Sequence, residues 1–124
     1  MVTALIVRPG EQPCVTEIKD DREFLNCAVS YGADMLCTAA VVPVERGIVA
    51  IYPWEGVMAG LPGNRKVGKR ILAGTFYIVR EIDGDLYSLQ PDDIARLSFR
   101  FRKIREFTDD EVINSWFDGL WLAM

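Results

Sequence analysis

A glycine-containing stretch near the middle of the chain holds the residues best suited to binding an anion. Residues 63–70 (GNRKVGKR) fit the spacing G-x-x-x-x-G-K. A Walker-type phosphate loop needs Ser or Thr after this lysine to hold magnesium, and Arg70 stands there instead. Two interpretations remain: a solvated basic loop, or a loop that binds phosphate or a nucleic-acid backbone. The binding side chains would be Arg65, Lys66, Lys69 and Arg70.

Asn64 and Arg65 are the residues of this stretch that we would test first. Asparagine tolerates left-handed backbone and bonds to its own loop. An arginine side chain binds carboxylates or phosphates through two parallel hydrogen bonds. A structural role is the alternative, in which both residues tie the loop to the rest of the domain, for example through an acidic side chain of the sheet.

A second basic cluster follows near residue 100. Arg96, Arg100 and Lys103 have the spacing i, i+4 and i+7 and would share one helix face, with Arg102 and Arg105 close by. Such a face suits a nucleic-acid backbone or an acidic protein groove. It also suits a helix C-terminus, where the dipole favours cations. The acidic total charge and the few stacking residues nearby argue against a sequence-specific DNA-binding protein.

Tryptophans form the third group of candidate contact residues. Trp116 and Trp121 lie in the last nine residues, and Trp54 follows an apolar segment at residues 48–52. They are interface anchors for a partner or for a second copy of the chain, or they pack on their own core.

Histidine is absent, and this limits the chemistry of the chain. A zinc site of Cys and His is excluded, as are Ser-His and Cys-His nucleophile pairs. We predict no cofactor and no metal, although Asp, Glu, Lys, Tyr or Cys could still support an enzyme. Cys14, Cys27 and Cys37 are widely spaced and odd in number, so we interpret them as reduced core residues of a cytosolic protein.

Charge is distributed unevenly along the chain. Residues 63–105 hold ten Lys or Arg and five acids, whereas the whole chain carries a net charge of −4. This asymmetry predicts a basic face and an acidic face, unless folding mixes the two. No run of apolar residues is long enough for a membrane span, and the first residues lack the basic region of a signal peptide.

The elements that must position these residues indicate one α+β domain with a mostly antiparallel sheet. One helix follows the first strands, and two helices end the chain. Pro91 begins the second helix, and Thr108 with Glu111 caps the third. The core would span about residues 2–101, with a helical extension at about 102–124. Expected strands are 2–8, 13–18, 34–44, 48–52, 71–80 and 86–89, and expected helices are 20–31, about 91–101 and about 109–122.

Several segments together resemble domain of unknown function family 3846, over about residues 4–101. They are residues 7–13 (VRPGEQP), 59–65 (AGLPGNR), 73–79 (AGTFYIV) and 85–89 (DLYSL). Residues 33–56 follow the family loosely, and the tail after about residue 102 looks like an addition. The resemblance implies a small cytoplasmic accessory protein of phages, plasmids and other mobile elements, and it implies no catalytic residues.

These observations favour a non-enzymatic binding protein that occludes the surface of a host or mobile-element protein, or of a protein–RNA complex. An inhibitor of a bacterial defence nuclease is the specific form of this hypothesis. A protein that binds a nucleotide or phosphate through residues 63–70 is the alternative.

Overall fold

The computed structural model describes residues 1–123, and it describes the side chains of residues 1–116. Strands and helices alternate unevenly along the chain, with the strands concentrated in its first two thirds. The strands are β1 (Val2–Val7), β2 (Cys14–Ile18), β3 (Ala39–Glu45), β4 (Ile48–Pro53), β5 (Gly63–Val67), β6 (Arg70–Ala73), β7 (Phe76–Ile82) and β8 (Asp85–Tyr87); the helices are α1 (Arg22–Val29), α2 (Pro91–Arg100) and α3 (Asp109–Ala123).

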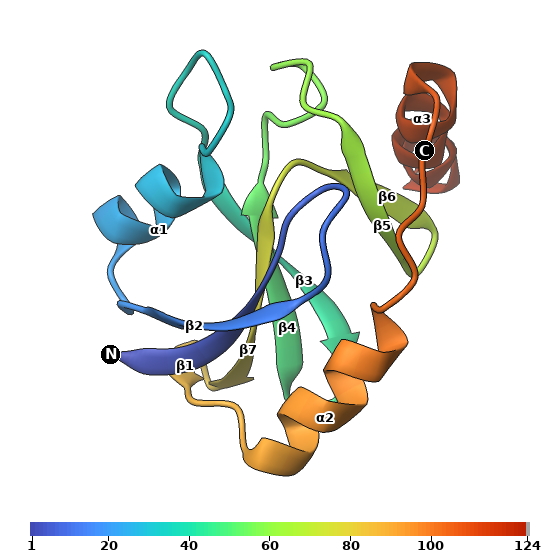
Figure 1. Cartoon of the computed structure of the whole chain (residues 1–124). Helices are drawn as coiled ribbons and strands as arrows, with labels where there is room; N and C mark the ends of the chain where they lie inside the picture. Colours follow the sequence, from blue (N-terminus) through green and yellow to red (C-terminus); the bar gives the residue numbers. More distant parts are fainter. Residues whose placement is uncertain (124) are drawn as a thin grey trace.

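The main sheet is antiparallel throughout the part of the chain that is described. Its strand order is β2-β1-β7-β4-β3, and β8 pairs with β7. Figure 1 shows α1 beside one face of this sheet and α2 beside the other. The predicted α+β class, with one helix after the first strands and two helices at the end, is confirmed.

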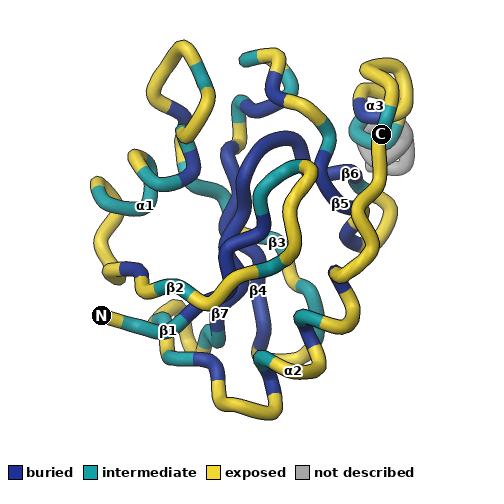
Figure 2. The backbone as a smooth tube through the Cα atoms, in the orientation of Figure 1, coloured by how far each residue is buried: buried dark blue, intermediate teal, exposed yellow. Residues whose placement is uncertain are grey.

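Alternating side chains of the central strands build a core on each face of the sheet. Leu5, Ala50 and Ile78 lie in the cluster that includes Leu97 and Phe101 from the region of α2. The intervening residues, such as Ile6 and Ile51, lie in the cluster that includes Val29 of α1. Figure 2 shows these central strands as the buried centre of the molecule.

A separate two-stranded sheet, β5–β6, packs against α3 beside the main sheet. Val112 of α3 is buried there with Leu61, Ile71 and Ala73. Two side chains of α3 also complete the hydrogen bonding of Ile71: the Ile71 N–H donates to Ser115 Oγ at 3.0 Å, and Trp116 Nε1 donates to the Ile71 carbonyl at 2.9 Å. A further β-strand would use the same N–H and carbonyl of Ile71 to pair with β6. Helix α3 therefore covers the free edge of β6.

Three predictions about the strand regions are wrong, the first two for reasons of backbone geometry. The expected strand at 71–80 is two strands, because Gly74 between them has a φ of +89°, a left-handed conformation that ends a strand. Residues 63–70 form a β-hairpin instead of an open loop, turning at Gly68 with a φ of +62°. The expected strand at 34–44 begins only at Ala39.

Helix ends agree closely with the capping signals. Asp21 caps α1 and accepts from the Phe24 N–H at 2.9 Å, so the helix begins at Arg22 and not at the expected residue 20. Pro91 begins α2 as predicted, and Thr108 and Glu111 exchange the predicted pair of capping hydrogen bonds at α3.

The cysteines differ from the prediction that all of them are core residues. Cys37 is buried, but Cys14 and Cys27 are exposed. Cys14 faces outward at the start of the edge strand β2, and Cys27 lies on the solvent side of α1. Among the described residues, no helix is both long and apolar enough to cross a membrane.

Candidate functional site

Asn64 and Arg65 lie inside the fold, not on its surface. Asn64 is fully buried and Arg65 is 3% exposed. The Asn64 amide donates to the carbonyls of Val7 and Gly74 at 2.9 and 2.8 Å. Asn64 therefore joins β5 to the end of β1 and to the junction of β6 and β7, and it serves the fold.

Arg65 makes three hydrogen bonds, all to uncharged oxygens. Its Nε donates to the Phe101 carbonyl at 3.0 Å, its Nη1 to Asn64 Oδ1 at 2.7 Å, and its Nη2 to the Glu11 carbonyl at 2.7 Å. No described carboxylate forms an ion pair with it. Burial lowers the pKa of this guanidinium, since charge is costly away from water.

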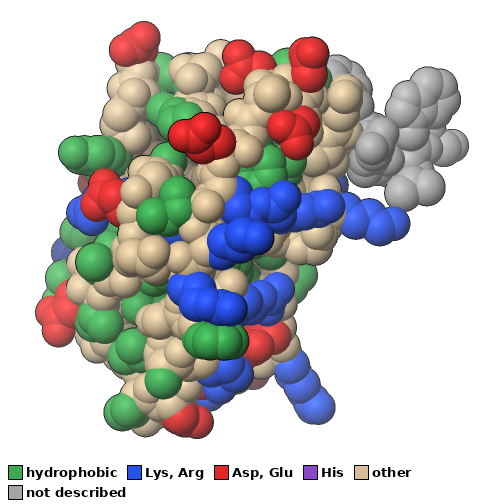
Figure 3. Space-filling model, turned by 45° about the vertical axis from the view of Figure 1, so that its right-hand side comes forward, with side chains coloured by type: hydrophobic (Ala, Val, Ile, Leu, Met, Phe, Trp, Pro, Cys, Tyr) green, Lys and Arg blue, Asp and Glu red, His purple; other side chains and the backbone are tan. Residues whose placement is uncertain are grey.

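The two basic clusters of the sequence meet above Arg65. A hollow of about 210 Å³ has β5 on one side. The end of α2 and the segment that follows α2 form its other side. We call it the basic groove. It is lined by Arg65, Lys66, Arg100, Phe101, Lys103 and Arg105. Figure 3 shows Lys and Arg side chains gathered across the middle of one face, with several carboxylates above them.

Four cations of the basic groove are exposed and lack a described ion-pair partner: Lys66, Arg100, Lys103 and Arg105. Arg100 donates to the Val44 carbonyl at 3.1 Å and so ties α2 to β3. Because Lys66 is far from Lys103 in the sequence, only folding brings these charges together. The arrangement can attract a phosphate or carboxylate without first breaking an internal ion pair.

Arg96 has a different role from the one that helical spacing predicted. It pairs with Glu45 of β3 and, at 3.0 Å, with Asp93. Asp93 also accepts a two-point contact from Arg80 at 2.8 and 2.9 Å. The Arg80 hydrogen bonds are the largest cause of the lowered pKa of Asp93, which falls to about 2. Arg96 is thus part of an internal ion-pair network that holds α2 on the sheet.

The remaining predicted residues do not line the basic groove. Lys69 is exposed on the β5–β6 turn, and the Arg70 guanidinium lies 4.8 Å from the ring centre of Trp116. Trp116 is half-buried among core residues, and Trp54, 57% exposed, meets its ring edge-on at 6.2 Å. The side chain of Trp121 is outside the described residues.

Phe99 is a site residue that the sequence analysis did not identify, and it lies against Arg102 of the second basic cluster. Phe99 is 65% exposed, and the Arg102 guanidinium stacks on its ring at 3.7 Å. The Arg102 Nη1 also donates to the Phe99 carbonyl at 2.7 Å, which fixes the stack. The signal was present, because Phe99 falls opposite Leu97 in the helical periodicity of α2 and must face solvent.

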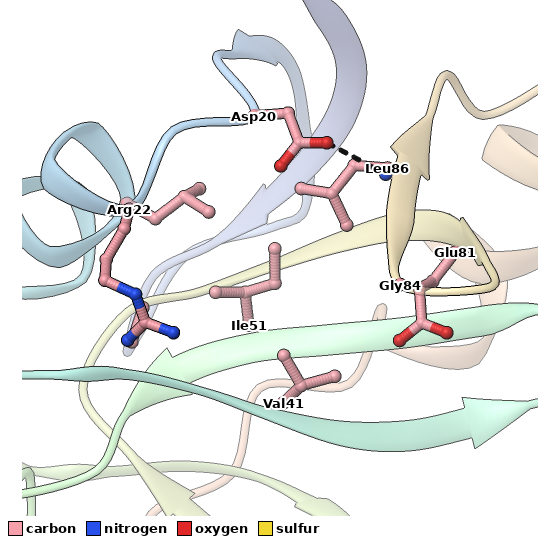
Figure 4. A pocket seen from close by; sticks show the side chains of 9 residues that line it. Asp20, Arg22, Val41, Ile51, Glu81, Gly84 and Leu86 are labelled. Carbon is pink, nitrogen blue, oxygen red and sulfur yellow. Dashed lines mark hydrogen bonds between the residues drawn. The ribbon is translucent and has the colours of Figure 1, made fainter.

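A second hollow, of about 300 Å³, lies between α1 and the β7–β8 turn. Figure 4 shows its floor, with Ile51 and Val41, and the charged side chains of Arg22, Asp20 and Glu81 around it. Asp20 accepts from the Leu86 N–H at 3.1 Å, so it fastens the β8 hairpin to the start of α1. Within the described residues, no cluster of three or more Cys, Asp or Glu is placed to hold a metal ion.

Comparison with known proteins identifies the family of the chain. A search of curated proteins and a search of solved structures each found no match. The family model described as "Domain of unknown function (DUF3846)" matches residues 2–102. This range includes β1 to α2 and ends in the basic groove, while α3 lies beyond it. The chain therefore belongs to the DUF3846 family.

Proposed function

We propose that the protein is a non-enzymatic binding protein of a phage or other mobile element, acting in the cytoplasm. Its basic groove docks on a partner surface that carries dense negative charge. The observation that supports this proposal is the convergence of Lys66, Lys103 and Arg105, which lack described ion-pair partners, over a buried Arg65 without a described carboxylate partner.

Electrostatics explains why this observation points to a ligand. Like charges held together repel each other, and they remain together only where the fold fixes them or an anion neutralises them. Arg65 fixes the two walls, since it bonds to the Phe101 carbonyl on one wall and belongs to β5 on the other. The fold therefore supports a basic surface that an anionic partner would neutralise.

The specific form of the proposal is an inhibitor of a host defence nuclease or of its protein–RNA complex. In this form the protein covers an anionic part of the nuclease complex and needs no catalysis of its own. The family resemblance to mobile-element proteins supports this context, and the charge of the basic groove supplies the contact.

Charge reversal tests the proposal. The variant Lys66→Glu, Lys103→Glu, Arg105→Glu reverses three exposed charges of the basic groove, and Lys19→Glu is a single-charge control at an exposed lysine beyond β2. Partner capture from host lysate, with and without ribonuclease, and protection of phage in host cells should fail for the groove variant alone. Equal partner capture and equal phage protection by the wild type, the groove variant and the Lys19→Glu control would contradict the proposal.

A phosphate-containing small ligand is the second candidate, and the buried Arg65 lining the basic groove favours it. A ligand that binds only the folded state raises the unfolding temperature as its concentration rises. Thermal unfolding in the presence of nucleotides and inorganic phosphate is the measurement, and a flat response across the panel would exclude this candidate.

A further inference from the structure

We infer that the anionic partner of the basic groove is a single-stranded nucleic acid, which passes along the groove and stacks bases on the aromatic side chains beside it. This inference rests on the proposed function and names the chemistry of the partner. It depends on two independent features, the positions of the cations and two aromatic–guanidinium pairs, in which Phe99 is exposed and Phe107 is half-buried.

The cations are placed to follow a phosphate backbone. Lys66 comes from β5, whereas Lys103 and Arg105 come from the segment after α2, so charge lies on both sides of the groove. Binding of a polyanion releases condensed counterions, and this provides affinity without any particular base sequence. Proteins that bind single-stranded nucleic acids commonly do so in a positively charged groove that follows the phosphate backbone. A hollow with cations on both walls has this character.

The aromatic–guanidinium pairs provide flat surfaces on which bases can stack, a contact that charge alone does not provide. The Arg102 guanidinium lies 3.7 Å from the ring centre of Phe99, and the Arg105 guanidinium lies 5.0 Å from that of Phe107. These pairs are in the same chain segment as Lys103, one on each side of it in the sequence. Unpaired bases stack on aromatic rings and on guanidinium planes, whereas the carboxylates of an acidic peptide bond only to the N–H groups at the guanidinium edge and leave an exposed ring such as Phe99 unused.

Duplex DNA is a poorer fit than a single strand. Reading a duplex requires a helix or a two-stranded ribbon that enters the major groove. The β5–β6 ribbon has the suitable shape, but α3 packs on β6, and the basic side chains Arg96 and Arg100 of α2 are bonded to Glu45 and Val44 of β3. The bases of a duplex are also stacked on each other and are not free to contact Phe99.

Fluorescence anisotropy with labelled oligothymidylate and oligouridylate of about 12 nucleotides tests the inference, with DNA and RNA as separate arms. The wild-type protein should bind at least one of them, and its affinity should fall as salt rises. Phe99→Ala should weaken binding about tenfold, and Phe99→Trp should retain it. Lys103→Glu should weaken binding and make it less dependent on salt.

Two control variants separate the site from general effects. Tyr31→Ala removes an exposed aromatic ring beside Arg8, 6.0 Å from the guanidinium, but outside the basic groove. Lys19→Glu makes the same charge change as Lys103→Glu at a distant exposed lysine. Both controls should bind the oligonucleotides like the wild type.

Four results would overturn the inference. If poly-glutamate binds and neither oligonucleotide does, the partner is an acidic protein, and the proposed function stands without the nucleic acid. If a duplex binds as tightly as the single strands, or if Phe99→Ala binds normally, stacking is not used. If no anionic probe binds, the basic groove is not a binding site, and both proposals fail.

Discussion

The Nη1 of Arg65 donates to the Oδ1 of its neighbour Asn64 at 2.7 Å, and both side chains are buried. Adjacent residues of a strand usually point to opposite faces, but the register of β5 shifts between Gly63 and Arg65. This irregularity lets the two polar side chains work as a pair. Between them they bond to the end of β1, the loop at Glu11, the β6–β7 junction and the end of α2.

Arg65→Lys should destabilise the protein by about 3 kcal/mol, although it keeps the charge. A lysine ammonium cannot reach the three separate acceptors that the guanidinium contacts, and it would be buried without a described counter-charge. Urea unfolding measures the change. Lys66→Ala, at the exposed neighbour, should change the stability by less than about 0.5 kcal/mol; equal effects at both positions would contradict the structural role of Arg65.

Acid should destabilise the protein through Asp93. Its pKa is 3.8 when unperturbed and about 2 in the folded protein, so folding favours the ionised form. The contribution, about 2 kcal/mol, is complete above pH 4 and disappears as the pH falls to about 2. Asp93→Asn should lower the free energy of unfolding at neutral pH. It should also reduce the fall in that free energy at acidic pH, which we call the acid limb, as measured by urea unfolding across the pH range. Asp92→Asn, one residue earlier and exposed, is the control and should leave the acid limb unchanged.

Gly63→Ala should weaken the docking of α3. A Cβ at this position would lie 2.7 Å from Val112 Cγ2 and 3.1 Å from the Phe107 Cβ, while the φ of Gly63 is not in the left-handed region. The cost, about 2 kcal/mol, therefore comes from close approach alone. In the Val112→Ala background the same substitution should cost clearly less, since the clashing methyl group is gone. An unchanged cost in that background would disprove the contact.

Ser115→Ala should expose the amide of Ile71 to hydrogen exchange. The Ile71 N–H donates to Ser115 Oγ, and removing this acceptor opens the edge of β6 to water. We expect exchange at Ile71 to accelerate about tenfold, corresponding to the loss of one hydrogen bond. Ser98→Ala in α2 is the control in the same nuclear magnetic resonance experiment, and it should leave the Ile71 amide protected.

The cysteines should differ in reactivity towards a thiol reagent. Cys14 and Cys27 are exposed and should react in the native protein. Cys37 is 1% exposed, and burial raises the pKa of its thiol, so less of it is thiolate. Mass spectrometry after brief alkylation should find two modified cysteines, and all three only in urea. Rapid modification of Cys37 in the native state would contradict its burial.

Periodicity and capping signals predicted much of the fold. Alternation identified the central strands, and Pro91, Thr108 and Glu111 located two helices, because these signals depend on neighbours in the sequence. The division at Gly74 was missed, since a glycine inside a strongly β-favouring run does not reveal its sign of φ. The same limit applied to the hairpin at Gly68.

The site was harder to predict than the fold, because it depends on contacts between distant segments. The sequence left a binding role and a structural role open for Arg65, with an acidic side chain as the expected structural partner. Its acceptors include backbone carbonyls at Glu11 and Phe101, which carry no sequence signature. Helical spacing grouped Arg96 with Arg100 and Lys103, yet Glu45 of β3 pairs with Arg96, and Lys103 lies beyond the helix end. That Lys66 and Lys103 share a groove follows only from the tertiary structure.

Ser115 and Trp116 give the chain an internal substitute for a neighbouring strand. A version ending at residue 102, where the family match ends, would leave the donor and the acceptor of Ile71 open to any extended peptide, including the same edge of a second molecule. Helix α3 thus guards against unwanted strand pairing, and truncated forms prepared for study would be prone to self-association through β6.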